Sequence, residues 1–214
     1  LMKDVNKYKI VSLILTVALL ATMARLVYST KVGVVKECDK TDIVINNILS
    51  RRSVRSFSDQ PVSRSRLDTL VRAAMAAPSG RDMRPWKFVV IDDRAVMDSL
   101  AKKLPYAKML AEARAAIVVC GDLSMTDDEG KSSVNWTFDC SAATENLLLS
   151  AEAMGLGAVW TGVYPYEDRL SVVSSTLNLP DHIIPLNVIP IGYSKGITEV
   201  KDKYDKSNIR YNSW

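Results

Sequence analysis

One stretch of the sequence, from Arg51 to Trp86, places two polar groups on either side of a helix-like segment. It opens with RRSVRS (residues 51–56), which contains three arginines and two serines. Guanidinium and hydroxyl groups together are typical of a phosphate site, because they present several charged and neutral donors to a few oxygen atoms. The stretch closes with Ala-Pro-Ser-Gly (residues 77–80), a turn whose amides and hydroxyl can approach a second part of a ligand. Taken alone, the basic block is also typical of a solvated face or a nucleic-acid patch.

The order and spacing of these two groups resemble those of the nitroreductase family of FMN-dependent oxidoreductases. Members commonly carry Arg-Arg-Ser-x-Arg-x-Phe followed by Ala-Pro-Ser and Pro-Trp. Three later motifs match in the family's order: NLLLSAEAMGLGAVWTG (146–162), IPIGY (189–193) and Lys-Asp-Lys (201–203). The resemblance covers residues 41–214 and is more specific for fold and cofactor than for substrate.

The resemblance implies an α+β fold in which helices wrap a mainly antiparallel sheet. It also implies an obligate homodimer, in which the tail of each subunit embraces the other. The length of 214 residues fits one domain with a substantial core. The tail carries Tyr204, Tyr211 and Trp214 but has no core of its own in which to bury them. This fits a tail that packs against the other subunit.

Apolar periodicity predicts helices and strands throughout the domain. Ser63 is the expected N-cap of one helix, and Pro78 ends it. Residues 124–135 are polar and without periodicity, so they are predicted to be a loop, of a length that is often functional. Helices are expected over residues 42–49, 63–76, 94–104, 107–114, 138–154 and 168–177, and strands over 87–91, 116–121, 157–163 and 186–192.

Composition excludes some other classes of function. A net charge of +4 is too mild to argue for nucleic-acid binding on its own. Cys38, Cys120 and Cys140 lack metal-ligand spacing, and the last two are expected to be core thiols. His182 is the single histidine, so neither a histidine triad nor a metal site is expected.

The first forty residues differ from the rest. Lysines precede the apolar run 10–24, which is followed by Arg25. This pattern fits equally a cleaved signal peptide and a membrane anchor through residues 10–28. We therefore expect a leader and linker over 1–40 and the family domain over 41–214. The protein is expected to be exported or membrane-anchored, with the cytoplasmic face of the membrane as the alternative.

The resemblance also implies how FMN is held. The cofactor needs a grip on its phosphate, a polar lining for its ribityl chain and ring, and a donor near the hydride-accepting nitrogen. For the two tail lysines, a solvated tail is the alternative interpretation. The positions that match the phosphate site are Arg51, Arg52, Ser53, Arg55, Lys201 and Lys203.

A second set of expected cofactor contacts lies in the loop that follows the helix. Pro78, Ser79 and Gly80 match a family loop that approaches the flavin, usually from the other subunit. Asp82 is included among these contacts. However, Asp82 and Arg84 replace the Asn and Gln of many relatives, which leaves open an Asp82–Arg84 ion pair or an Arg84 that faces the substrate.

The third set, Trp160, Thr161 and Gly162, matches the segment that runs along one face of the flavin. There the backbone amide of Gly162 is expected to donate to the hydride-accepting nitrogen, while Trp160 and Thr161 cover the ring. Glycine permits such a close backbone approach. The alternative is that Gly162 merely ends a strand. No side chain is expected to act as an acid or base.

Together these features predict an FMN-dependent oxidoreductase. It would pass a hydride from NADH or NADPH to an electron-poor acceptor, a nitroaromatic or a quinone, in a ping-pong cycle. Two alternatives remain open: a membrane-anchored flavin reductive dehalogenase, and a flavin-binding protein without NAD(P)H turnover. A nucleic-acid partner ranks last, because no basic stripe continues the arginine block.

Overall fold

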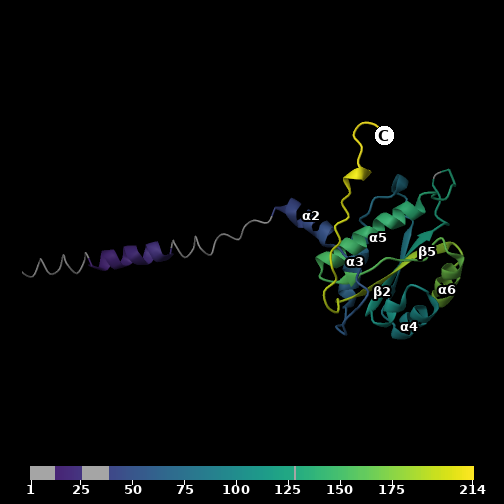
Figure 1. The fold of residues 1–214 in the computed structure, drawn as a ribbon, viewed down its shortest axis with the longest axis horizontal. Helices are drawn as coiled ribbons and strands as arrows, with labels where there is room; N and C mark the ends of the chain where they lie inside the picture. The colour runs from purple at the N-terminus through teal and green to yellow at the C-terminus, as the bar shows by residue number, and fades with distance from the viewer. Residues whose placement is uncertain (1–12, 26–38, 128) are drawn as a thin grey trace, which may run out of the picture. The chain divides into compact units, whose positions relative to one another are not determined.

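The computed structural model describes residues 13–25, 39–127 and 129–214. The chain divides into two compact units, Leu1–Ile45 and Asn46–Trp214. In the first unit, residues 13–25 form a helix (Figure 1). The side chains of this helix are exposed. Among the described residues, no helix is long and apolar enough to cross a membrane. The predicted signal or anchor segment and Cys38 lie partly or wholly outside the described residues, so the expectations for them stay predictions.

The elements alternate between helix and strand in a way that confirms the predicted α+β class. α2 begins in the first unit and ends in the second. The order is α2 (Lys40–Ser50), α3 (Arg64–Ala74), η1 (Gly80–Asp82), β1 (Trp86–Ile91), α4 (Arg94–Lys103), η2 (Lys108–Ala111), β2 (Ala115–Asp122), α5 (Trp136–Ala153), β3 (Gly157–Ala158), β4 (Thr161–Gly162), α6 (Glu167–Leu177), β5 (Ile183–Gly192) and η3 (Lys206–Asn208), where η marks a short 3-10 turn.

The sheet is antiparallel throughout, with the order β1-β2-β5-β3 and with β4 also paired to β5. Every residue of β2 is buried, because helices cover both faces. Ile117 and Val119 pack in one core with α3 and α5, while Val118 and Cys120 pack in another with α4 and α6. Figure 1 labels these four helices around β2. The period of two in β2 therefore produces three layers.

Two element predictions were wrong. Residues 107–114 do not form a helix. They contain only the four-residue turn η2, and the chain joins the sheet directly afterwards, where Ala115 pairs with Ile191. The strand expected over 157–163 is broken into β3 and β4. The chain leaves the ladder at Val159 and Trp160 and returns in unchanged register, since Ala158 pairs with Ile191 and Thr161 with Val188.

Candidate functional site

The arginine block is held against the short strand β3. Ser53 forms a parallel bridge with Ala158, and the Val54 amide donates to the Ala158 carbonyl at 3.0 Å. Gly157 makes this approach possible, because a Cβ there would lie 2.7 Å from Val54 Cγ1. The polar side chains of the block are thereby carried on a buried backbone bridge.

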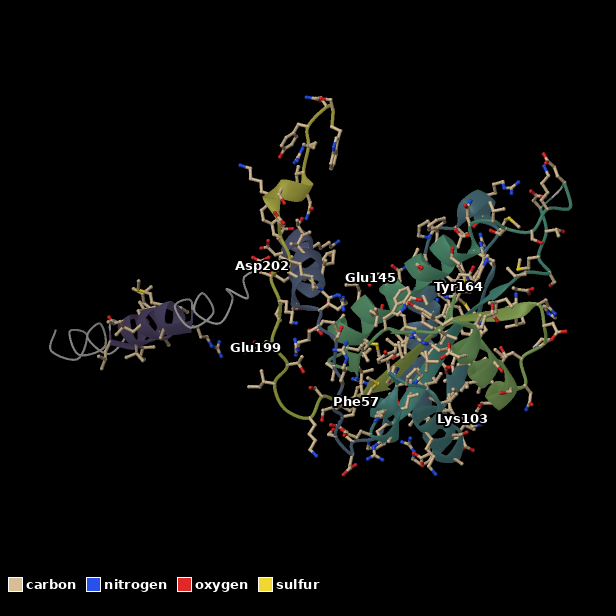
Figure 2. All side chains as sticks on the ribbon, turned by 45° about the vertical axis from the view of Figure 1, so that its right-hand side comes forward. Phe57, Lys103, Glu145, Tyr164, Glu199 and Asp202 are labelled. Atoms are coloured by element: carbon tan, nitrogen blue, oxygen red, sulfur yellow. The ribbon has the colours of Figure 1, made fainter. Side chains whose placement is uncertain are left out.

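The block and the C-terminal segment meet around one cavity of about 300 Å³. All six residues predicted to bind phosphate line it, although they come from opposite ends of the domain. Figure 2 labels Glu199 and Asp202 on the C-terminal segment that closes this side. The complete lining is Arg51, Arg52, Ser53, Arg55, Thr198, Glu199, Lys201 and Lys203.

Two of the arginines are fixed by carboxylates on α5. Arg51 Nε lies 3.2 Å from Glu145 Oε1, and Arg52 Nη1 lies 3.1 Å from Glu152 Oε1. Arg52 also donates to the Ser50 carbonyl at 3.3 Å, and its buried Nε has no partner in the described part of the chain. Basic groups still outnumber carboxylates around the cavity, so the site favours an anion.

The segment that follows β3 presents a backbone edge. The Val163 amide donates to the Leu186 carbonyl at 3.0 Å. Because antiparallel ladder bonds alternate, the amide and carbonyl of Gly162 point away from β5. A Cβ on Gly162 would meet only Trp160 Nε1, at 3.9 Å. This edge is therefore uncrowded where a Cβ on Gly162 would lie, and its Gly162 carbonyl accepts a hydrogen bond from Arg169 Nη1 at 3.0 Å.

The side chains around this edge differ in exposure. Trp160 is 37% exposed, whereas Thr161 is 7% exposed and its Oγ1 has no partner among the described residues. Any contact of Thr161 with a ring would therefore fall to its backbone. Gly162 lies four residues beyond Ala158, about 13 Å in extended chain. A ligand that carries a phosphate, a sugar chain and a ring system spans such a distance.

The Pro78–Gly80 loop does not line the phosphate cavity within one chain. Its Gly80 amide donates to Asp139 Oδ1 at 2.9 Å, and Ser79 Oγ accepts from the Arg84 amide at 3.0 Å. The first of these bonds holds the loop against α5.

Of the two alternatives left open for Asp82 and Arg84, the structure contains the ion pair. Arg84 Nε donates to Asp82 Oδ1 at 2.7 Å, and this hydrogen bond lowers the pKa of Asp82. Both residues, together with Arg81, have left-handed backbone angles, with φ between 49° and 54°. The Asp82 carboxylate is therefore engaged by a neighbour two residues away, in a loop of unusual backbone conformation.

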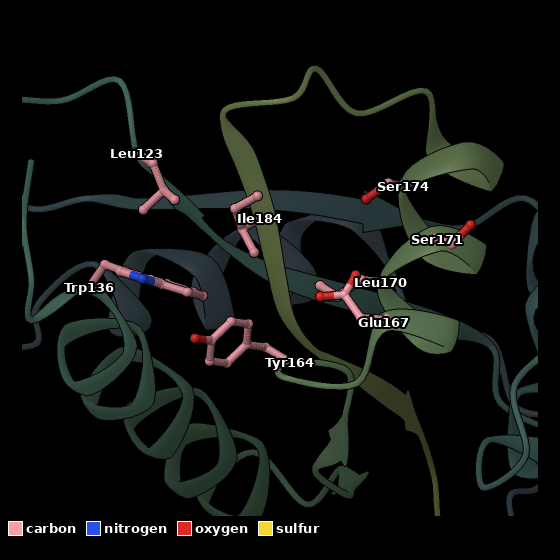
Figure 3. Close-up of a pocket in the computed structure, with 8 residues that line it drawn as sticks. All are labelled: Leu123, Trp136, Tyr164, Glu167, Leu170, Ser171, Ser174 and Ile184. Atoms are coloured by element: carbon pink, nitrogen blue, oxygen red, sulfur yellow. The ribbon is translucent and has the colours of Figure 1, made fainter.

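A second cavity, of about 430 Å³, opens beside Tyr164, two residues after Gly162. Figure 3 shows Trp136 and Tyr164 on one side of it and Glu167 on the other. The rings of Trp136 and Tyr164 meet edge to face at 4.9 Å, which fixes that wall. The sequence had singled out none of these residues.

Comparison with known proteins identifies the chain's family. The model of the nitroreductase family matches residues 48–193. The chain belongs to the nitroreductase family. A relative from Methanothermobacter thermautotrophicus, named "Putative NADH dehydrogenase/NAD(P)H nitroreductase", is 40% identical over 171 residues, which are 80% of this chain and 87% of that protein.

Solved structures of nitroreductases agree with the fold. One from Parabacteroides distasonis, under the same name, is 53% identical with a TM-score of 0.76, over 80% of this chain and 98% of that one. An FMN-dependent nitroreductase from Clostridium difficile is 27% identical with a TM-score of 0.71, over 79% and 99% of the two chains. The resemblance to this family is thereby confirmed.

The residues present fit the FMN of the family. Guanidinium, ammonium and hydroxyl donors suit a phosphate, and a Cβ on Gly162 would have only Trp160 Nε1 within 4 Å. Sequence reasoning missed Glu145 and Glu152, which fix the arginines. Their spacing of seven on a predicted helix was an available signal, because such residues share a face. It also missed Arg169, which donates to the Gly162 carbonyl and carried no signal.

Proposed function

We propose that this nitroreductase passes a hydride from NADH or NADPH through FMN to a nitroaromatic or quinone acceptor in a ping-pong cycle. Family membership makes the chain an FMN-dependent NAD(P)H oxidoreductase. One observation supports the proposed binding mode above all. Two segments from opposite ends of the domain converge on one basic cavity, beside a strand that leads to an open glycine edge.

The protein's part in this cycle is to bind and orient. Ser53, Arg55 and the two tail lysines hold the phosphate through charge-assisted hydrogen bonds, while Arg51 and Arg52 stay anchored to α5. The Gly162 amide donates toward the hydride-accepting nitrogen, and Trp160 shields that side. Bound flavin supplies reversible two-electron chemistry. With Trp160 covering one side of a bound ring, donor and acceptor would have to use the other side in turn.

We further propose that the working unit is a homodimer, with Pro78, Ser79 and Gly80 completing the site of the other subunit. These residues do not line the phosphate cavity of their own chain. A cavity of about 620 Å³ combines four apolar or aromatic residues with four charged ones in its lining, namely Ile48, Leu49, Val200, Tyr204, Arg51, Lys201, Asp202 and Lys203. Tyr204 is 73% exposed. Light scattering of the purified chain should return twice the mass of 23.7 kDa.

An anaerobic titration of the purified full chain tests the redox proposal. A flavin absorbance band that bleaches on NADH or NADPH and returns on adding a quinone supports it. A yellow protein that neither donor bleaches rules out NAD(P)H turnover and favours the flavin-binding alternative. A protein that takes up no FMN rules out the proposed site.

A matched pair of tail variants tests the phosphate site. Lys203→Ala removes a cation that lines the cavity, so FMN affinity should fall about tenfold, in line with one charge-assisted bond. Lys206→Ala removes a charge three residues further on, outside the lining, and should leave the affinity unchanged. Equal affinities for both variants would exclude Lys203 from the site.

Export or anchoring through residues 10–28 is a separate proposal that rests on the apolar sequence alone. Fractionation of cells that express the full chain, followed by mass measurement of the recovered protein, tests it. Recovery with the membranes supports an anchor, loss of the leader supports a signal peptide, and an intact chain without membrane contradicts both.

A further inference from the structure

Arg169 contacts the backbone of the glycine that faces the open edge. It lies in the first turn of α6 and donates from Nη1 to the Gly162 carbonyl at 3.0 Å. Its guanidinium carbon lies 3.8 Å from the ring centroid of Tyr166 and 5.1 Å from that of Tyr106. Cation–π contacts at these distances hold the guanidinium in a fixed position.

The hydrogen bond from Arg169 to Gly162 lies where β4 has few hydrogen bonds to the rest of the sheet. β4 has only two residues, and the peptide between Gly162 and Val163 is held by β5 at its amide end alone. Its carbonyl points the other way, toward Arg169. Glycine has the greatest backbone freedom of any residue, so the orientation of this peptide depends on what its carbonyl contacts.

The alternation of hydrogen-bonding directions along β4 also places the Arg169 guanidinium on the edge of the strand that faces the proposed flavin site. The amide and carbonyl of one strand residue point the same way, so Arg169 lies on the edge from which the Gly162 amide points. A fixed positive charge there stabilises negative charge that develops on a ligand at that edge.

We propose that Arg169 is a positioning residue: through the Gly162 carbonyl it fixes the amide that meets the flavin, and its charge raises the flavin's midpoint potential. This rests on the proposed flavin site. Lysine cannot replace it fully, because only a planar guanidinium can stack on Tyr166 while it donates to the carbonyl.

Arg66 offers a matched control on another part of the domain. It donates from Nη1 to the Met154 carbonyl at 2.9 Å and lies 5.8 Å from the ring centroid of Tyr193. It thus makes the same two kinds of contact as Arg169 without touching β4. If a fall in midpoint potential or reduction rate came only from removing a stacked arginine, the Arg66 and Arg169 variants should show it equally.

The experiment compares Arg169→Gln, Arg169→Lys and Arg66→Gln in the full chain. In the FMN-loaded protein, Arg169→Gln should shift the midpoint potential to a more negative value and slow reduction by the nicotinamide about tenfold, as expected for the loss of one charged hydrogen bond. Arg169→Lys keeps the positive charge but not the stacked guanidinium. Its midpoint potential and its rate of reduction should therefore lie between those of the wild type and Arg169→Gln. Arg66→Gln should leave both quantities unchanged.

Hydrogen exchange in the FMN-free protein gives a readout that needs no flavin. The Val163 amide shares its peptide with the Gly162 carbonyl, so Arg169→Gln should speed its exchange about tenfold, while Arg66→Gln does not. An unchanged potential with unchanged Val163 exchange would overturn the proposal, as would equal shifts from both glutamine variants. If the wild type binds no flavin, the proposed function fails, but the exchange result still decides whether Arg169 orders β4.

Discussion

Adding one methyl group at Gly157 should separate the arginine block from β3. A Cβ at this position would lie 2.7, 2.8 and 2.9 Å from three atoms of the Val54 side chain. Val54 is 2% exposed, and its amide is bonded to the next residue of β3, so it has little room to retreat. Gly157→Ala therefore forces either the side chain or the bridge to move.

The size of the effect follows from two opposing contributions. Overpacking of a buried site costs about 1–3 kcal/mol. Replacing glycine by alanine returns about 0.4–1 kcal/mol, because the unfolded chain loses freedom. The free energy of unfolding should therefore fall by about 1–2 kcal/mol. For a domain of this size, that lowers Tm by roughly 2–8 °C.

Gly162→Ala supplies the matched comparison, because the same methyl group there meets only Trp160 Nε1 at 3.9 Å. Circular dichroism should show FMN-free Gly162→Ala unfolding within about 0.5 kcal/mol of the wild type. FMN affinity, measured by fluorescence quenching, should nevertheless fall if the ring binds as proposed, because the methyl group would enter the space assigned to it. Gly157→Ala should lose both stability and affinity.

A double-mutant cycle decides whether the Val54 contact is the cause. Val54→Ala removes two of the three atoms that an alanine at position 157 would strike, Cγ1 and Cγ2, and leaves the Val54 Cβ. The double variant should therefore be about 1 kcal/mol more stable than the sum of the single losses predicts. Strict additivity, or equal Tm values for Gly157→Ala and Gly162→Ala, would refute this reasoning.

Two further predictions concern titratable groups. The Phe57 amide donates to Glu112 at 3.1 Å and lowers the pKa of that carboxyl below its ordinary value. Its contribution to stability is then complete at neutral pH and is lost as pH falls through the lowered pKa; a carboxyl NMR titration at the ordinary value would contradict this. Burial raises the pKa values of the Cys120 and Cys140 thiols to about 12. Iodoacetamide at neutral pH should therefore label them in denaturant but not in the folded protein, and peptide mapping would reveal any exception.

Local patterns were sufficient for the long elements. The periodicity over residues 138–154 predicted α5 to within two residues, and the valine-rich run before Gly121 predicted β2. Both signals come from burial repeated along one element, which needs no knowledge of the partner. The break between β3 and β4 left no such signal. Each of these strands has two residues, and whether so short a segment is a strand depends on its pairing with β5.

The sequence by itself determined the family and the α+β class, and it singled out six residues that line one basic cavity, since these depend on residue types at set spacings. Only the tertiary structure decided which partners those residues have. Glu145 and Glu152 anchor two arginines because α5 packs beside the block, and Arg169 reaches Gly162 because α6 follows β4 directly. Such contacts depend on how elements pack in space, and no local pattern of residues encodes that arrangement.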